Sequence, residues 1–319
     1  MDARVLAFDV GGTSTKIGLI APDGSISHFR RIPTQASGHD PMPFVSRLIA
    51  ELDTLLTESG ASFHILGIGG SMHGEIDDAR RGPVIAGNTP ALRGFDMRGA
   101  LEARFNLPVT LHNDLTAHGL GEYHFGVGRG VRRFMCVAAG TGLGAVLLVD
   151  GAPFITQGGN SGNTGLIILD PEGPLDSNGI RGSAEALCGV PGIERLAAEH
   201  YGHPTMAHDV IARARDGDDP IAVAIMTQVG AWLGQMIASL SVIYYPHRVA
   251  LTGGTSAAGA ILLEACRAEF ERLVGAFFRD LAQNTDGQFQ DVEIILGAGG
   301  AETALKGAAV ELFQGHGLL

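Results

Sequence analysis

The sequence predicts an α/β protein made of two similar domains, and three observations support this prediction. Apolar runs that each lead into a glycine-rich turn recur along the chain, at residues 64–70, 133–149, 248–259 and 292–300. Helical patterns lie between these runs, and strands that alternate with helices are typical of α/β proteins. A chain of 319 residues, of which 45% are hydrophobic, is also long and apolar enough to fill two cores.

The first element is a hairpin at residues 5–20, which read VLAFDVGGTSTKIGLI. Two apolar strands flank a short turn of glycine and hydroxyl residues. The turn offers backbone N–H groups to an anion, and its side chains add donors and one positive charge. The residues concerned are Gly11, Gly12, Thr13, Thr15 and Lys16. The spacing differs from the GxxxxGK[ST] phosphate loop, and no helix follows the turn as in a dinucleotide-binding unit.

Asp9 stands near the end of the first, otherwise apolar strand of this hairpin. An unpaired charge there is costly unless a metal or another cation meets it. A phosphate-bearing nucleotide with Mg²⁺ would satisfy the aspartate and the turn together. An ordinary tight hairpin with a solvated aspartate is the alternative that this segment leaves open.

A second hairpin, at residues 133–149, repeats the arrangement with Gly140, Thr141 and Gly142 in its turn. One such hairpin in each half predicts two similar domains that face a shared nucleotide. Because no low-complexity linker occurs, we place the boundary at a helix or short hinge near residue 115. The predicted domains are 1–115 together with 301–319, whose final helix packs back on the first domain, and 116–300.

The helices predicted between the strands cover residues 43–58, 96–105, 114–124, 184–200, 221–245 and 259–283. The segment 221–245 carries no charged residue and is long enough to cross a bilayer. Its interspersed polar residues and the soluble character of the surrounding chain favour a buried core helix. Gly230 and Gly234, one helical turn apart, would let another helix approach closely, so we expect subunit packing here.

Composition narrows the classes of function. A formal net charge of −12 argues against a protein whose main partner is the nucleic-acid backbone, but it permits a local ATP site. The three cysteines, Cys136, Cys188 and Cys266, are far apart and lack metal or redox spacing. They fit small core residues in a reducing cytoplasm, and the N-terminus has no signal-peptide pattern.

Two polar segments carry candidate chemistry. Asn113 and Asp114 end a short apolar strand and begin a helix. Asp114 either caps that helix or acts as a base that takes a proton from a substrate hydroxyl. Asn88 has donors and acceptors suited to sugar hydroxyls, or it is a turn residue before Pro90.

Other polar residues are less informative. The glycine-rich stretch 157–173 fits no periodicity and is equally compatible with a surface loop. Glu185 begins a helix, where a solvated first-turn glutamate is the alternative to a functional one. No carboxylate or cysteine stands at ligand spacing from His73, His112 and His118, so we expect solvated or core histidines rather than a metal site. The absence of G-x-S-x-G weakens a serine-hydrolase interpretation.

These motifs in combination resemble the ROK family, within the actin-like sugar-kinase superfamily. AFDVGGTSTKIGLI is similar to the family's first phosphate segment, AAGTGLGAVLLVDG to its second, and VALTGGTS to its adenosine-side glycine motif. AGNTPALRGFDMRGALEARFNLPVTLHNDLTAHGLGEYHFG resembles its substrate segment. The pieces follow the family's order over nearly the whole chain, which implies two actin-like (RNase H-like) domains around a central cleft.

The resemblance also implies roles for individual residues. Asp114 would be the general base that takes the proton of a sugar's primary hydroxyl as it attacks the γ-phosphate of ATP. Asp9 would help to organise Mg²⁺. The sugar would be held by Asn88, Asn113, Asn163 and Glu185. The phosphates would be lined by Gly11, Gly12, Thr13, Thr15, Lys16, Gly140, Thr141 and Gly142, and the adenosine by Gly253 and Gly254.

Two segments depart from the family's pattern. The G-E-x-G-H segment, in which glutamate touches the sugar and histidine binds zinc, reads GNTGL and has Asn163 and Leu166 at those positions. The usual C-x-C-G-x-x-G-C-x-E reads DSNGIRGSAE, which puts Asp176, Asn178 and Ser183 where three cysteines stand. We therefore expect no zinc. Asn163 keeps hydrogen-bonding capacity without the charge, which argues against glucose as the preferred sugar.

The sequence thus predicts a cytoplasmic, ATP-dependent hexose kinase of the glucokinase, fructokinase or N-acetylhexosamine kinase type. By resemblance it would be a homodimer that acts on a small sugar and binds neither nucleic acid nor membrane. A non-catalytic sugar sensor, either a regulator or a pseudokinase, is the alternative. The phosphate hairpin begins at residue 5, which leaves no room for a DNA-binding domain before it, and Asp114 and both hairpins argue against a pseudokinase.

Overall fold

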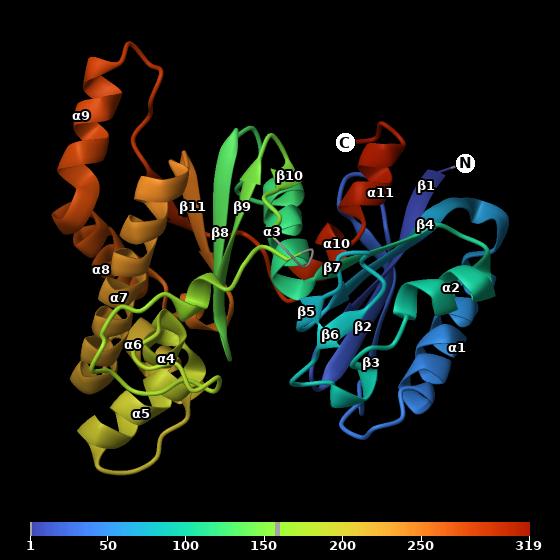
Figure 1. Ribbon diagram of the computed structural model, residues 1–319, viewed down its shortest axis with the longest axis horizontal. Helices are drawn as coiled ribbons and strands as arrows, with labels where there is room; N and C mark the ends of the chain where they lie inside the picture. Colours follow the sequence, from blue (N-terminus) through green and yellow to red (C-terminus); the bar gives the residue numbers. More distant parts are fainter. Residues whose placement is uncertain (1, 157–159) are drawn as a thin grey trace. The chain divides into compact units, whose positions relative to one another are not determined.

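The computed structural model describes residues 2–156 and 160–319, which form two compact units. Unit 1 comprises Met1–Arg129, Gly151–Gly162 and Gly299–Leu319, and unit 2 comprises Gly130–Asp150 and Asn163–Ala298. Each unit combines a sheet with packed helices (Figure 1). The predicted α/β class is therefore confirmed.

The sheet of unit 1 has the strand order β3-β2-β1-β4-β7. Its strands are β1 (Asp2–Val10), β2 (Ser14–Ile20), β3 (Ile26–Pro33), β4 (Phe63–Met72) and β7 (Val109–Asn113). β1 and β2 form the predicted antiparallel hairpin, whereas β1, β4 and β7 are parallel neighbours. Asp9 pairs with Ser71, and Ser71 pairs with His112, so the carboxyl ends of the three parallel strands meet at one edge.

Helices cover both faces of this sheet because side chains alternate along β1. Leu6 and Phe8 join the core beneath α1 (Met42–Ser59) and α2 (Met97–Phe105), whereas Val5 and Ala7 join the core beneath α10 (Thr303–Gly307) and α11 (Val310–Gly315). Smaller elements of unit 1 are η1 (Gly60–Ser62), η2 (Pro90–Leu92), β5 (Glu75–Ile76), β6 (Pro83–Ile85) and β10 (Ala152–Pro153).

Helix α3 (Asp114–Phe125) packs with unit 1, so the unit boundary differs from the one predicted near residue 115. Two glycines allow the close packing of α3 on α10. A Cβ at Gly121 would lie 2.2 Å from the carbonyl oxygen of Thr303, and one at Gly307 would lie 1.7 Å from that of Ala117. These contacts join segments far apart in the chain, which sequence pattern does not show.

The sheet of unit 2 contains β9-β8-β11-β12 in that order. These strands are β8 (Arg133–Ala139), β9 (Leu143–Val149), β11 (Arg248–Thr252) and β12 (Glu293–Leu296). The helices are α4 (Ala184–Cys188), α5 (Val190–Tyr201), α6 (Ala207–Asp216), α7 (Pro220–Tyr244), α8 (Ala260–Phe270) and α9 (Ala276–Asn284), with η4 (Thr164–Leu166), η5 (Gly254–Ala258) and a π-turn η6 (Glu271–Gly275). The helix predicted over 184–200 is two helices, because Gly189 is extended and Pro191 lies in the first turn of the second.

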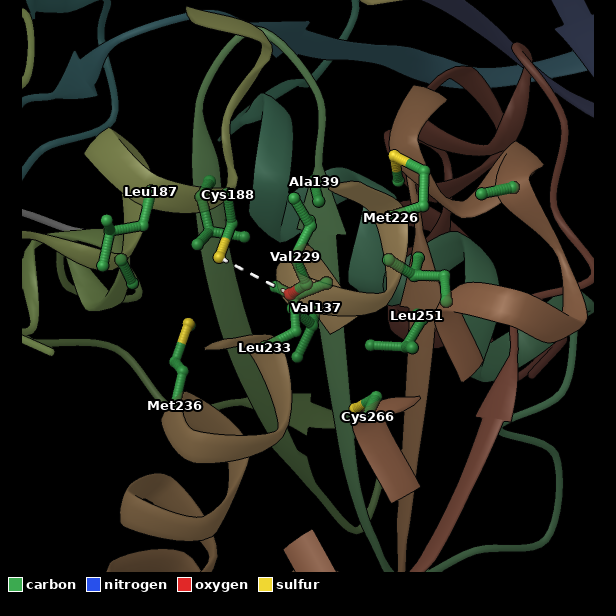
Figure 2. Packing of buried hydrophobic residues seen from close by; sticks show 14 of the residues in the cluster. Val137, Ala139, Leu187, Cys188, Met226, Val229, Leu233, Met236, Leu251 and Cys266 are labelled. Carbon is green, nitrogen blue, oxygen red and sulfur yellow. Dashed lines mark hydrogen bonds between the residues drawn. The ribbon is translucent and has the colours of Figure 1, made fainter. Parts of the chain in front are cut away.

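Helix α7 lies in the core of unit 2. Its Met226, Val229 and Leu233 pack among side chains of the neighbouring strands (Figure 2). By length and mean hydropathy (1.5) α7 passes a test for a membrane span, but 56% of that window is buried inside the protein, so this is weak evidence for one. The packing instead fits the predicted core helix.

The glycines of α7 are covered by α8 of the same chain. A Cβ at Gly230 would lie 2.6 Å from the Leu262 carbonyl oxygen, and one at Gly234 would lie 2.4 Å from that of Cys266. The predicted close helix approach is present, but the predicted subunit packing on this glycine face is wrong, because α8 occupies the space.

Candidate active site

The charge of Asp9 is met within the first hairpin. Asp9 is 6% exposed, and its Oδ1 accepts a hydrogen bond from Ser71 Oγ at 2.8 Å. Lys16 Nζ lies 2.8 Å from Oδ2, because Asp9 and Lys16 are cross-strand partners in β1 and β2. The cation that sequence reasoning required is therefore already supplied by the next strand.

The turn of this hairpin has exposed residues on one side and buried hydroxyl groups on the other. Gly12 and Thr13 are exposed, whereas Thr15 is fully buried. The Thr15 hydroxyl lies 2.9 Å from that of Thr34, which donates to the carbonyl oxygen of Gly11 at 2.7 Å. Thr15 thus supports the turn from inside, and Gly12 and Thr13 form the surface that an anion can reach.

Asn88 lies beside this turn. It is exposed in the segment between β6 and η2. A Cβ at Gly12 would lie 3.1 Å from Asn88 Cβ, so the absence of a side chain at residue 12 leaves room for Asn88. The structure therefore brings a predicted sugar residue next to a predicted phosphate turn.

Asn113, rather than Asp114, caps α3. Asn113 Oδ1 accepts hydrogen bonds from the backbone N–H groups of Leu115 (2.9 Å) and Thr116 (3.3 Å). Its Nδ2 donates to the Gly74 carbonyl oxygen (2.9 Å) and to Asp114 Oδ1 (3.0 Å). Since an amide has only two such protons, both donors of Asn113 are engaged in the protein.

The two oxygens of Asp114 have different surroundings. Oδ1 accepts from Asn113 and from the backbone N–H of Leu115 at 2.9 Å. Oδ2 lies 3.1 Å from Nδ1 of His73, and the Asp114 side chain is 40% exposed. One oxygen is bonded to the helix start, and the other contacts His73.

Sequence reasoning missed the contribution of His73. The expectation was a solvated or core histidine, but its ring lies against Asp114 and is 37% exposed. The available signal was its place directly after β4, at the same sheet edge as Asp9.

The other two histidines near this edge are buried to different degrees. His112 is 5% exposed, and its Nε2 lies 3.2 Å from Glu311 Oε2. Burial lowers the pKa of His118, although Glu122, Asp9 and Asp114 oppose this effect. Across residues 2–156 and 160–319, no group of three or more His, Cys, Asp or Glu side chains is arranged to hold a metal ion.

The second glycine turn, in unit 2, carries no charge of its own. The N–H of Gly140 donates to the Gly142 carbonyl oxygen at 2.9 Å, and Thr141 and Gly142 are exposed. Glu185 Oε2 accepts from the backbone N–H of Leu143 at 3.0 Å, and a Cβ at Gly142 would lie 2.8 Å from that oxygen. Glu185 is therefore bonded to the turn and is not a solvated first-turn residue.

The two glycines predicted to lie beside the adenosine, Gly253 and Gly254, follow β11. Because β11 is parallel to β8, with Thr252 paired to Ala138, the turns after these strands leave the same sheet edge. Gly253 has φ +83°, and a Cβ there would lie 2.2 Å from the Ala139 carbonyl oxygen. Gly254 has no atom within 4 Å of a built Cβ. Only glycine fits at 253, whereas 254 borders open space.

Hydrogen bonds hold the segment that departs from the family's zinc pattern. Asp176 Oδ1 accepts from the backbone N–H groups of Asn178 (2.8 Å) and Ile180 (2.9 Å), and Oδ2 accepts from Ser183 Oγ (2.7 Å). Ser183 Oγ also caps α4, on which Glu185 lies. The absence of zinc stays a prediction. In this structure the hydrogen bonds of Asp176 and Ser183 connect the segment to the start of α4.

Asn163 precedes η4 and is exposed. Its side chain makes no capping hydrogen bond to that short helix. Residues 157–159 of the glycine-rich stretch lie outside the described residues.

A sequence model of the ROK family matches residues 5–308. The chain belongs to the ROK family. It is 30% identical to a glucokinase of Thermotoga maritima over 81% of this chain and 84% of the relative. It is likewise 30% identical to an N-acetyl-D-glucosamine kinase of Aliivibrio fischeri, over 78% and 83% of the two chains.

Solved structures share the fold of this ROK protein. A ROK glucokinase from Streptomyces griseus, crystallised with glucose and AMPPNP, has a TM-score of 0.77 at 25% identity and covers 98% of this chain and 99% of its own. The fold is thus the actin-like α/β fold of the ROK hexokinases. Likeness to proteins named as sugar kinases supports sugar kinase activity for this chain.

Proposed function

We propose that this ROK protein is an ATP-dependent kinase that phosphorylates the primary hydroxyl of a hexose or hexose derivative. The observation that carries the proposal is that Asn113 and Asp114 have different contacts at the start of α3. Asn113 caps α3, so Asp114 keeps Oδ2 outside the helix start at the carboxyl edge of the sheet. A partly exposed carboxylate oxygen in this place is suited to accept a proton.

Asp114 would act as the general base. As the sugar oxygen attacks the γ-phosphorus of ATP, its proton would pass to Oδ2 of Asp114. The bond between the γ-phosphorus and the bridging oxygen would break to release ADP. A positioned base of this kind contributes roughly 10²–10⁴ in rate.

Asp9 would help to hold the Mg²⁺ that accompanies ATP. Mg²⁺ in kinases is commonly held by one or two carboxylates together with substrate phosphates, and Asp9 places one carboxylate beside the open turn at Gly12 and Thr13. Because Ser71 and Lys16 already contact the two oxygens of Asp9, the ion would have to replace one of these contacts to reach the carboxylate directly. When bound, Mg²⁺ would neutralise charge on the phosphates, and the Lys16 ammonium lies next to Asp9 to add a second positive charge.

Unit 2 would supply mainly backbone contacts to the nucleotide, from Gly140, Thr141 and Gly142, with Gly253 and Gly254 beside the adenosine. The Glu185 carboxylate can accept hydrogen bonds from sugar hydroxyls. By the family resemblance we assign Glu185 to the sugar, together with Asn88, Asn113 and Asn163. The engaged amide of Asn113 would have to exchange one of its present bonds to do so.

Asn163 would favour a sugar other than glucose. An amide both donates and accepts hydrogen bonds, whereas a glutamate only accepts and brings a charge. The relatives include kinases named for glucose and for N-acetyl-D-glucosamine, so both kinds of substrate belong in a test.

The experiment is a coupled assay of ADP release over hexoses, 2-amino sugars and N-acetylated sugars, with ATP and Mg²⁺. Sugar-dependent ADP release is expected for at least one compound, and mass spectrometry should find the phosphate on the primary hydroxyl. Binding of sugar without ADP release across the panel would contradict the kinase and favour a non-catalytic sensor.

We further propose a cytoplasmic homodimer without bound zinc, on the strength of the family resemblance and of Asp176, Asn178, Ser183 and Leu166 at the ligand positions. Light scattering of the purified protein should give twice the mass of the chain. Elemental analysis should find no stoichiometric zinc, and one zinc per chain would contradict this part of the proposal.

A further inference from the structure

A histidine stands beside the carboxylate to which we assign base catalysis. His73 follows β4 directly, and its Nδ1 lies 3.1 Å from Asp114 Oδ2. We propose that His73 is a positioning residue that orients Asp114 and sets the pH range in which Oδ2 accepts the sugar's proton. This inference rests on the proposed function.

The contact between His73 and Oδ2 restricts rotation of the Asp114 carboxylate. Oδ1 is already held by Asn113 Nδ2 and by the N–H of Leu115. With His73 at Oδ2, both oxygens have partners that come from different segments of the chain. A carboxylate held at both ends keeps one orientation, which is what positioning a reactive atom requires.

His73 is itself held in place by the chain around it. Met72 and Asn113 are paired in β4 and β7, so His73 and Asp114 leave the sheet from adjacent positions. The next residue, Gly74, has φ +100° and accepts a hydrogen bond from Asn113 Nδ2. A Cβ at Gly74 would lie 1.9 Å from the Ile85 carbonyl oxygen, so the turn after His73 has little freedom.

The protonation state of His73 would change what Oδ2 can do. A neutral imidazole makes at most one ordinary hydrogen bond to Oδ2 and leaves a lone pair for the sugar hydroxyl. An imidazolium makes a charge-assisted bond, which stabilises the carboxylate anion and lowers its affinity for a proton. Protonation of His73 should therefore reduce turnover on the acid side.

Other titratable groups at this edge have their own partners or surroundings. Asp9 pairs with Lys16, His112 with Glu311, and Glu122 Oε1 accepts from the Gly299 N–H.

His118, on the same helix as Asp114, is kept neutral to lower pH by burial. Glu75 follows two residues after His73 in β5 and is half-buried. His118 is thus the rival source of a histidine-like acid limb and needs its own variant.

The test compares pH profiles of kcat for the wild type and His73→Gln. The acid limb should move to lower pH in the variant, because no imidazolium can then form beside Oδ2 of Asp114. At pH 7.5 kcat should fall about fivefold, the effect of one hydrogen bond, with the sugar KM nearly unchanged. His64→Gln is the matched control, since His64 is an exposed histidine at the other end of β4.

An unchanged acid limb in His73→Gln would overturn the inference, as would an equal shift in His64→Gln or a shift found only in His118→Gln. A second measurement does not depend on turnover. The apparent pKa of His73, followed by NMR, should fall when Asp114→Asn removes the carboxylate, and no change would overturn the pairing. If the wild type releases no ADP with any sugar, the proposed function is wrong. The NMR titration still tests the contact between His73 and Asp114 separately.

Discussion

The two units of the molecule repeat one topology but differ in the chemistry at the edge of the sheet. In each unit an antiparallel hairpin with a glycine turn is followed by two parallel strands, in the orders β2-β1-β4-β7 and β9-β8-β11-β12. The first hairpin pairs Asp9 with Lys16 just before its turn. The second pairs Ala138 with Gly144 in the same place.

The difference separates what topology provides from what side chains provide. Both hairpins present exposed backbone in a glycine turn, which is sufficient to meet phosphate oxygens. In the two turns and the strand ends beside them, the charged side chains that we assign to catalysis, Asp9, Lys16 and Asp114, all belong to unit 1. In our proposal, therefore, the glycine turns of both units contact the phosphates, and the chemistry depends on charged side chains of unit 1.

The largest expected effect comes from removing the base. Asp114→Asn keeps the shape and the bond at Oδ1 but cannot take the proton, so kcat should fall by roughly 10²–10⁴. Calorimetry should show sugar and nucleotide affinities close to those of the wild type. Asp150→Asn, an exposed carboxylate of unit 2 paired with Arg132, is the control and should leave kcat unchanged. Near-parental turnover in Asp114→Asn would show that this carboxylate serves only the helix start.

The next effect comes from making the first hairpin resemble the second. Asp9→Ala leaves the Lys16 ammonium, whose side chain is 18% exposed, without its carboxylate. The free energy of unfolding should drop by about 3 kcal/mol, and activity should be lost with it.

A double-mutant cycle tests the same pair. Asp9→Ala combined with Lys16→Gly, the side-chain pair found in unit 2, should be less destabilised than the sum of the single variants. Asp2→Ala, at the exposed start of β1, is the control for urea unfolding. Additive single effects would show that Asp9 and Lys16 do not stabilise one another.

The backbone of unit 2 should be sensitive at one glycine and tolerant at the next. Gly253→Ala places a Cβ against the Ala139 carbonyl oxygen at positive φ, so a loss of about 2 kcal/mol in the free energy of unfolding is expected. Gly254→Ala, which meets open space, is the matched control. Equal stabilities of the two variants in urea would contradict the described turn.

The smallest effect concerns the Glu311 carboxylate of unit 1 and its two partners, Arg80 and His112. Arg80 and His112 hold the pKa of Glu311 well below its ordinary 4.5, through hydrogen bonds from Arg80 first and His112 second. A depressed carboxylate pKa stabilises the fold above pH 4.5, and this contribution is lost as the pH falls below that value. The Glu311 side chain is 38% exposed, so Glu311→Gln should cost only about 1 kcal/mol at pH 7.

Acid unfolding checks these contacts. Below pH 4.5 the stabilities of Glu311→Gln and the wild type should converge, because the Glu311 carboxylate is then protonated in the unfolded wild type while it stays ionised in the folded protein. Curves that stay parallel down to pH 3 would contradict the assignment to Glu311.

The sequence predicts those parts of the fold that depend on local pattern. Both hairpins, their glycine turns and the apolar helix α7 follow from side-chain periodicity and turn composition. The grouping of α3 with unit 1 and the covering of Gly230 and Gly234 by α8 do not. Both depend on contacts between distant segments, where one backbone lies close to another.

The candidate site shows the same limit at the scale of single atoms. Spacing alone cannot decide whether Asn113 or Asp114 caps α3, because either side chain can reach the first N–H groups. Likewise, the partner of His73 is set by the parallel register of β4 and β7, which places residues 73 and 114 side by side. The position of His73 directly after a strand was visible in the sequence, but the residue that it contacts was not.

The three cysteines of the chain are all buried in unit 2, where burial raises the pKa of Cys266 to about 12 and that of Cys188 further still. Native thiols in this state react slowly with maleimides, because the thiolate is the nucleophile. A single cysteine engineered on the surface of each unit can thus carry a fluorescent dye while the natural ones stay in place. Energy transfer between two such dyes would then report, in real time, any change in the distance between the labelled positions as sugar and nucleotide are added.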